Sequence, residues 1–239
     1  AATRRFAVAR LLARLTCAGE IEAIVAGSAT LTTPAARERA ARALQSYCAG
    51  ALLMPYERFL EDAVRTRYDV DLLRRLYAAS VEQACHRLVT LRRPGAEGIR
   101  FAFIRSDPAG FVTKRLPLPN LPLPRYGGAC PLWAVYRAFQ TPEAVVRQLA
   151  EFPSSDRFLF IARTVAKGDA AYGQPRRLLA IMLACDAVYA DQTVYGDRLD
   201  LSAGAPADHV GTTCRLCARR DCPQRQEDVI IKPQASEEA

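Results

Sequence analysis

The spacing of hydrophobic residues changes at Arg93-Pro94-Gly95, and this change divides the chain into two parts. Before it, apolar residues recur every three or four positions, which predicts helices over residues 6–25, 34–53, 56–67, 69–77 and 81–88. After it, Ile99, Phe101 and Phe103 alternate as in a strand. We therefore expect an α+β protein, with a helical domain over residues 1–95 and a mixed α/β domain over residues 96–239.

The second part should contain an antiparallel sheet, similar to the sensor domains of the PAS or GAF kind. Further strands are predicted over residues 111–115, 157–165 and 176–185, with one helix after Cys130-Pro131 and another from Thr141-Pro142 to about Glu151. Residues 116–124 contain four prolines, so this segment is expected to be extended but outside the centre of a sheet. Beyond Asp197 the pattern becomes irregular.

The composition is that of a soluble globular protein. The chain has 239 residues, 50% of them hydrophobic, and no apolar run approaches the ~20 residues that span a membrane. Nor does any stretch have the order of a signal peptide. Because the chain begins without Met, inside a predicted helix, we expect a fragment that lacks an N-terminal part.

The chain is basic, with 33 Lys+Arg against 25 Asp+Glu and a net charge of +8. Lys114, Lys167 and Lys232 are its only lysines, so arginine supplies almost all of the positive charge. Guanidinium groups bind phosphates and carboxylates through paired donors, which suits anionic ligands. Most of the arginines are nevertheless expected on solvated faces.

Three of the eight cysteines, Cys214, Cys217 and Cys222, lie within nine residues. The other five are isolated, which does not fit a secreted disulfide framework and favours a reducing cytoplasm. Thiolates at this spacing can bind one metal centre, and neighbouring arginines favour the thiolate form. An iron–sulfur cluster is the preferred interpretation, with a structural zinc ion or free cysteines as alternatives.

A metal site would require a fourth ligand. Cys130 is preferred because it precedes a proline, as Cys222 does, and because Gly127-Gly128 lets the backbone come close. His209 and Cys185 are the alternatives. A metallopeptidase is excluded, since His86 and His209 are the only histidines and no His-Glu-x-x-His motif exists. Nucleophile-elbow, phosphate-loop and dinucleotide motifs are also absent from the sequence.

A group of basic residues lies around the turn at residues 106–110 and the proline-rich segment. Arg105, Lys114, Arg115 and Arg125 flank these segments, and Tyr126 with two glycines follows. Several cations beside glycine backbone predict a cradle for ligand phosphates. The equally weighted alternative is an edge strand protected by its charges.

Taken together, these segments resemble the bacterial family of short-chain fatty acyl-CoA-responsive transcriptional regulators, which includes the propionate and methylcitrate-cycle regulators. The resemblance extends over residues 10–226. It rests most specifically on Tyr126-Gly-Gly-Ala-Cys-Pro-Leu-Trp133 and on Cys214-Arg-Leu-Cys-Ala-Arg-Arg-Asp-Cys-Pro-Gln-Arg225, and also on residues 51–55, 68–70, 86–95, 105–110 and 114–115.

The resemblance implies a degenerate peptidase-like helical domain, followed by a domain that senses short-chain acyl-CoA and contains an iron–sulfur cluster, expected to be [4Fe–4S]. The family's N-terminal helix-turn-helix is absent here, so this chain alone is not expected to read a DNA sequence. The family often has Asn and Ser near positions 111 and 113, where this chain has Phe111 and Thr113.

The leading hypothesis is therefore the effector-binding region of a cytoplasmic, homo-oligomeric transcriptional regulator without enzymatic activity. The basic group would bind the phosphates of coenzyme A, and Trp133 and Phe103 would line the acyl pocket. One alternative is a metal-dependent cytosolic enzyme that uses Cys130 and Asp186. Another is a structural zinc protein that mediates protein contacts.

Overall fold

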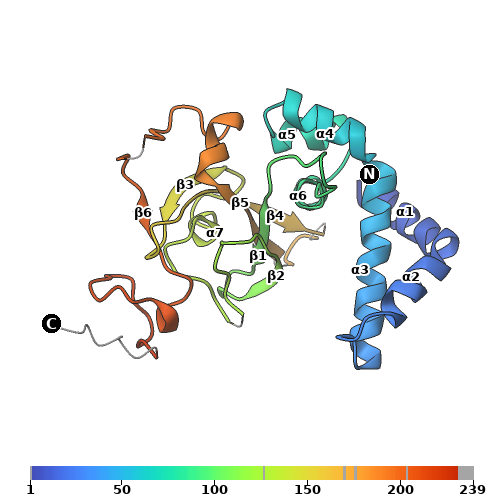
Figure 1. The fold of residues 1–239 in the computed structure, drawn as a ribbon, viewed down its shortest axis with the longest axis horizontal. Coiled ribbons are helices and arrows are strands. Elements are labelled where there is room, and N and C mark those ends of the chain that lie inside the picture. Colours follow the sequence, from blue (N-terminus) through green and yellow to red (C-terminus); the bar gives the residue numbers. More distant parts are fainter. Residues whose placement is uncertain (1, 126, 169–170, 175–176, 203, 231–239) are drawn as a thin grey trace. The chain divides into compact units, whose positions relative to one another are not determined.

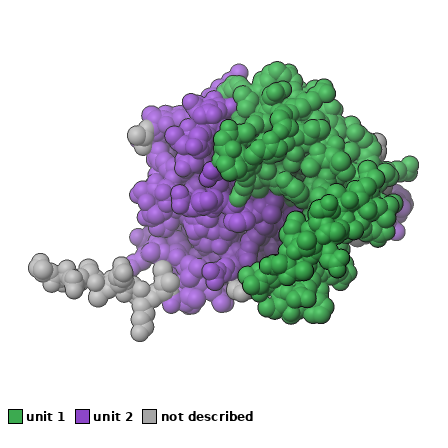
Figure 2. All heavy atoms as spheres, turned by 45° about the vertical axis from the view of Figure 1, so that its right-hand side comes forward, with its two compact units in different colours: residues 1–98 green, residues 99–239 purple. Residues whose placement is uncertain are grey.

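The computed structural model describes residues 2–125, 127–168, 171–174, 177–202 and 204–230. It divides into two compact units, residues 1–98 and residues 99–239, which are coloured separately in Figure 2. The first is helical, and the second is built around a sheet (Figure 1). The expected α+β class is confirmed. Among the described residues, no helix is both long enough and apolar enough to cross a membrane.

Unit 1 contains six helices within its described residues. They are α1 (Ala2–Thr16), α2 (Ala18–Ala26), α3 (Pro34–Leu53), α4 (Tyr56–Arg65), α5 (Val70–Leu76) and α6 (Val81–Val89). Helices α1 and α2 pack along α3, and α5 packs on α6. The small buried side chains of Ala9 and Ala13 on α1 and Ala49 on α3 permit close helix packing.

Capping residues fix where these helices begin. Thr33 accepts a hydrogen bond from the amide of Ala36, and Pro34 occupies the first turn of α3. Ser80 and Gln83 form a capping box at the start of α6. The helix predicted over residues 6–25 is interrupted at Cys17, where Thr and Gly neighbours weaken the helix and α2 begins separately.

Unit 2 contains one six-stranded sheet. Its elements are β1 (Ala102–Ser106), β2 (Val112–Leu116), α7 (Ala134–Arg137), β3 (Val146–Glu151), β4 (Arg157–Lys167), β5 (Arg177–Asp186), the 3-10 helix η1 (Ala187–Gln192), β6 (Asp208–His209) and the 3-10 turn η2 (Cys214–Leu216). The strand order is β2-β1-β5-β4-β3-β6. Neighbouring strands are antiparallel except β3 and β6, which are parallel.

One face of this sheet forms the core of unit 2 with α7 and the segments around it. Trp133 is fully buried there. The centroid of its ring lies 5.3 Å from that of Phe160 and 6.1 Å from that of Phe152, and both ring pairs pack edge-on. Ala102 and Ile104 of β1 point into the same core. Because side chains alternate along a strand, Phe103 between them points to the opposite face.

The helix predicted from Pro142 to Glu151 is wrong, since these residues form a turn and then β3. Glu143 has a positive φ of 69° and its amide donates to Thr164 Oγ1, so the segment turns instead of starting a helix. Strand β3 then pairs with β4 over six residues, and Gln148 and Ala150 are buried on its inner side. Sheet pairing thus overrides the helix preference of Glu, Ala, Gln and Leu.

Candidate functional site

A cavity of about 720 Å³ lies on unit 2 where four loop segments meet. Its lining comes from the β1–β2 turn (109–111), the glycine-containing segment (125, 127–129, 131), Tyr136 of α7, and two parts of the cysteine-containing segment (213–216 and 226, 227, 230). Phe111, Leu216 and Ile230 are exposed apolar residues in this lining. A volume of this size and an apolar lining are typical of ligand sites.

Tyr136 holds two walls of this large cavity together. Its hydroxyl donates to the carbonyl of Gly110 at 2.9 Å and accepts from the amide of Ala129 at 2.7 Å. Burial raises the pKa of this phenol, so it stays protonated and can keep donating. A Cβ at Gly128 would lie only 3.0 Å from the Gly110 carbonyl oxygen, which explains why glycine is needed where these walls approach.

A buried amide positions α7, whose Tyr136 lines the large cavity. The Gln148 side chain accepts from the amide of Ala134 at 2.8 Å and donates to the carbonyl of Leu132 at 2.9 Å. It also donates to Asp208 Oδ2 at 2.8 Å, which connects β3 to β6. These bonds satisfy an end of α7 that would otherwise have an unpaired amide.

The four predicted cysteine ligands line a second, much smaller cavity. Cys130, Cys214, Cys217 and Cys222 all border a space of about 20 Å³, together with His209. Each is a free thiol, and burial raises the pKa of Cys130. The space is about that of one water molecule. Among the described residues, no three His, Cys, Asp or Glu side chains are arranged to hold a metal ion.

Backbone contacts bring these cysteines together from distant parts of the chain. The amide of Cys130 donates to the carbonyl of Thr212 at 2.9 Å, and Trp133 Nε1 donates to that of Gly211 at 2.8 Å. A Cβ at Gly211 would lie 2.8 Å from Cys217 Sγ, so only glycine leaves room for this thiol. These two hydrogen bonds and the space at Gly211 therefore place residues 211–217 beside residue 130.

Arg225 organises the loop that contains the other cysteines. Its guanidinium donates to the carbonyls of Cys214 at 3.1 Å and Cys217 at 3.3 Å, and also to that of Arg219. It also donates to the carbonyl of Glu227 at 3.3 Å, so one side chain binds four backbone carbonyls of an otherwise irregular segment. The sequence presents Arg225 only as one of several arginines near the cysteines, and its tethering role was not predicted.

Both the sequence and the structure of this chain are similar to those of known proteins. Residues 90–239 match the sequence model of the short-chain fatty acyl coenzyme A regulator C-terminal family, and residues 1–89 match the IrrE N-terminal-like domain of the M78 peptidase type. A solved Mycobacterium tuberculosis transcriptional regulator is 37% identical, with a TM-score of 0.91 over 98% of this chain and 71% of the other. The chain belongs to the short-chain fatty acyl-CoA regulator family.

Two curated relatives give further detail about the family. The propionyl-CoA carboxylase regulator of Cereibacter sphaeroides is 45% identical over 97% of this chain and 50% of its own length. The HTH-type transcriptional regulator PrpR of Mycobacterium tuberculosis is 39% identical over 93% of this chain and 46% of its own length. The chain thus spans about half the length of these relatives. All are named as regulators, which confirms the expectation of a family of regulators and not of enzymes.

Within this acyl-CoA regulator fold, the predicted basic group does not form one cradle. Arg105 and Lys114 are paired across β1 and β2 and so point to one face. Arg115 pairs with Ile104 on the core face, and its guanidinium donates to the carbonyls of Pro124 and Arg125. Of the four, only Arg125 lines the large cavity. The alternation of strand side chains separates residues that are close in sequence.

The predicted acyl pocket also requires correction. Trp133 and Phe103 point to opposite faces of the sheet, so they cannot line one pocket. Trp133 is a buried tether and not a lining residue of the large cavity. Sequence reasoning missed Phe111, Leu216 and Arg215, which do line it. Tyr126 lies outside the described residues.

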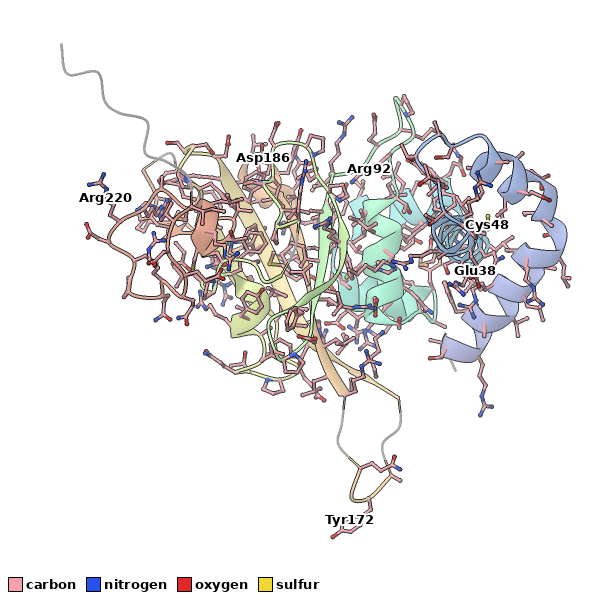
Figure 3. The ribbon with its side chains drawn as sticks, turned by 90° about the horizontal axis from the view of Figure 1, so that it is seen from below. Glu38, Cys48, Arg92, Tyr172, Asp186 and Arg220 are labelled. Carbon is pink, nitrogen blue, oxygen red and sulfur yellow. The ribbon has the colours of Figure 1, made fainter. Side chains whose placement is uncertain are left out.

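The alternative ligands and catalytic residues are placed as follows. Cys185 is on β5, paired with Leu159 on the face opposite Trp133, and burial raises its pKa. It lines neither cavity, whereas His209 lines the small one. Asp186 lies at the end of β5 (Figure 3), where it accepts from the amide of Val188 and caps η1. Asp186 and Cys130 therefore do not line the same cavity, whereas the enzyme alternative required both residues in one site.

Proposed function

We propose that this chain is the effector-sensing part of a bacterial transcriptional regulator and that its large cavity binds a short-chain acyl-CoA. One observation supports this most directly. Three of the segments that carry the family resemblance, residues 105–110, 126–133 and 214–225, contribute walls to the same cavity. Segments distant in sequence that meet around a cavity of this size are typical of a ligand site.

The chemistry of the cavity suits the two ends of such a ligand. Arg125 and Arg215 provide guanidinium groups for the phosphates of coenzyme A, and the ion pair of Arg215 with Glu227, at 3.0 Å, keeps one of them at the rim. The acyl chain would cover the exposed apolar surfaces of Phe111 and Leu216. Each methylene buried there would contribute ~0.8 kcal/mol. Arg105 and Lys114 would add only long-range attraction.

We also propose that the four cysteines hold an iron–sulfur cluster of the [4Fe–4S] type, with zinc as the alternative metal. Support comes from four thiols, at residues 130, 214, 217 and 222, that border one cavity. An all-thiolate donor set suits iron–sulfur clusters and zinc alike. A cluster bound there would join residue 130 to the loop of residues 214–225. When bound, the cluster would supply electron-transfer chemistry or hold the loop.

DNA recognition in this proposal belongs to a helix-turn-helix outside the described domains, in a protein that works in the cytoplasm. Two relatives are named HTH-type regulators, and this chain spans less than half of them. This part of the proposal predicts that the chain alone binds operator and scrambled DNA equally weakly in a gel-shift assay.

Calorimetry with acetyl-, propionyl- and butyryl-CoA on metal-loaded protein tests ligand binding. Arg125→Glu should weaken all three thioesters at least tenfold, because it affects the shared phosphates. Phe111→Ala should instead change the preference among chain lengths. Arg177→Glu is the matched control, because Arg177 is an exposed arginine on β5 that lines neither cavity, so binding should be unchanged. Absence of heat with every thioester refutes the sensor assignment.

Metal content tests the cysteine proposal separately. Iron and zinc analysis, with absorption near 400 nm, should show iron in anaerobically purified protein. Cys130→Ser should reduce metal content more than Cys185→Ser, which affects a thiol remote from the cavity, or His209→Ala. Equal metal content in all three variants would show that the fourth ligand is none of these residues.

A further inference from the structure

Cys17, where helix α1 ends and α2 begins, lies in the row of side chains that packs on α3. Its amide donates to the carbonyl of Ala13, and its own carbonyl accepts from the amide of Ile21, both at 3.0 Å. Ala13 and Ile21 are both buried. Because residues four apart lie on one side of a helix, Cys17 continues their row, and both α1 and α2 pack on α3 (Figure 1).

Cys48 meets Cys17 from the other side of this packing. It lies on α3 (Figure 3), next to Ala49, which is fully buried. The side chains of Cys17 and Cys48 share a hydrogen bond, so the two sulfur atoms are neighbours. Both are half-buried free thiols, whereas Cys85, the third cysteine of unit 1, is buried. Two adjacent thiols are therefore within reach of a small solute.

Two other roles fit these thiols less well. A cysteine can act as a small apolar residue in a helix interface, but packing alone does not require two thiols in contact. A metal ion would need further donors, and no three His, Cys, Asp or Glu side chains of the described residues are arranged to hold one. A pair of neighbouring thiols is, by contrast, the arrangement from which a disulfide forms on oxidation.

We propose that Cys17 and Cys48 form a redox-sensitive pair, which hydrogen peroxide converts into a disulfide between the α1–α2 junction and α3. One sulfur atom of the pair attacks a peroxide oxygen, the O–O bond breaks, and a sulfenic acid and one water form. The second thiol then attacks the oxidised sulfur, the S–O bond breaks, and the hydroxyl leaves with the thiol proton as a second water. Two thiols are thereby oxidised while one peroxide is reduced to water.

The environment of Cys48 determines which thiol reacts first. Burial raises the pKa of Cys48, and the neighbouring Cys17 raises it further. Because the thiolate is the nucleophile, Cys17 should attack the peroxide and Cys48 should then attack the sulfenic acid. The disulfide would make unit 1 more stable when oxidised, because a cross-link restricts the unfolded chain. This inference depends on neither acyl-CoA nor a metal.

Peptide mapping of the full chain, purified anaerobically, tests the pair directly. After a stoichiometric dose of hydrogen peroxide, the remaining thiols are blocked with iodoacetamide, and the protein is digested with trypsin without reduction. Cleavage after arginine places Cys17 in residues 15–37 and Cys48 in residues 43–58, each without another cysteine. Mass spectrometry should find these two peptides joined, both in the native chain and in the control variant Cys85→Ser. Absence of this cross-link, or an equal yield from urea-unfolded protein, overturns the proposal.

Two single variants separate the roles of the thiols. Cys48→Ser should accumulate a sulfenic acid at Cys17, which dimedone labels, whereas Cys17→Ser should give about tenfold less label at Cys48. Peroxide should raise the thermal midpoint of the native helices by about 5 °C, measured by circular dichroism, and should not raise it in either variant. Equal labelling of the two variants overturns the assigned order of reaction. An unchanged midpoint in fully cross-linked protein overturns the stabilising effect.

Discussion

Replacing Gln148 by Leu should destabilise unit 2 by about 3 kcal/mol. The substitution keeps most of the buried side-chain volume and removes three hydrogen bonds, to Ala134, Leu132 and Asp208. Each bond contributes about 1 kcal/mol net. The bond to Asp208 would normally exceed this because its acceptor is charged, but the Asp208 side chain is 55% exposed, so solvent reduces it to a similar value.

Urea unfolding followed by the fluorescence of Trp133 measures this change, because Trp133 is the only tryptophan and lies in the core of unit 2. With a slope of about 2 kcal/mol per molar urea, the midpoint should fall by about 1.5 M. Gln140→Leu serves as the control, since Gln140 is exposed in the same unit, and its effect should stay within about 0.5 kcal/mol.

The loss of these three hydrogen bonds should also change hydrogen exchange near the large cavity. Hydrogen exchange of the amides around residues 132–136 and 208–211 should accelerate, because Gln148 connects α7 to β3 and β6. A Gln148→Leu variant within 1 kcal/mol of the native chain, measured at an unchanged urea slope, would refute the view that this amide holds α7 to β3 and β6.

Three other predictions concern separate parts of the chain. Ser80→Ala should cost unit 1 about 1 kcal/mol through loss of the capping box, whereas Ser46→Ala in the middle of α3 should cost little, as measured by urea unfolding and circular dichroism. Burial and the hydrogen bond to Asp62 raise the pKa of Tyr77 to about 12, so unit 1 should lose stability as pH rises from 10 to 12. Unfolding experiments at each pH should show that Tyr77→Phe removes this part of the loss. Arg225→Gln should raise the alkylation rate of Cys217 severalfold in metal-free protein, because the loop carbonyls lose the guanidinium that donates to them. An unchanged alkylation rate, measured by mass spectrometry, would contradict the tethering role.

The helices of unit 1 were predictable because their ends are determined by local chemistry. Thr33-Pro34 and the Ser80 capping box specify starts that involve only neighbouring residues. Strand β3 was not predictable in this way, since the residues it pairs with on β4 and β6 lie 6 to 58 residues further along the chain. Two adjacent β-branched residues, Val145 and Val146, were the only local signal against a helix.

Only some residues of the candidate site could be grouped from the sequence, because local spacing places some of them and the pairing of distant strands places the others. The four cysteines border one small cavity, and the short spacing of three of them limits how far apart those thiols can lie, but their role as metal ligands stays a prediction. The basic residues were grouped by closeness in sequence, but β1 and β2 send Lys114 and Arg115 to opposite faces. Knowing the register of a hairpin is therefore necessary before its charges can be assigned to one ligand.

Tyr136, Trp133 and Arg225 share a function that a sequence does not reveal. Each has a polar group that could contact a ligand, but each instead donates to a backbone carbonyl of a segment distant in sequence or irregular in structure. The cavities lie among loops, and loops lack the repeated hydrogen bonds that fix helices and strands. Side-chain tethers replace those bonds, so the residues nearest the cavities divide into those that hold the walls and those, such as Phe111 and Arg125, that remain available to a ligand.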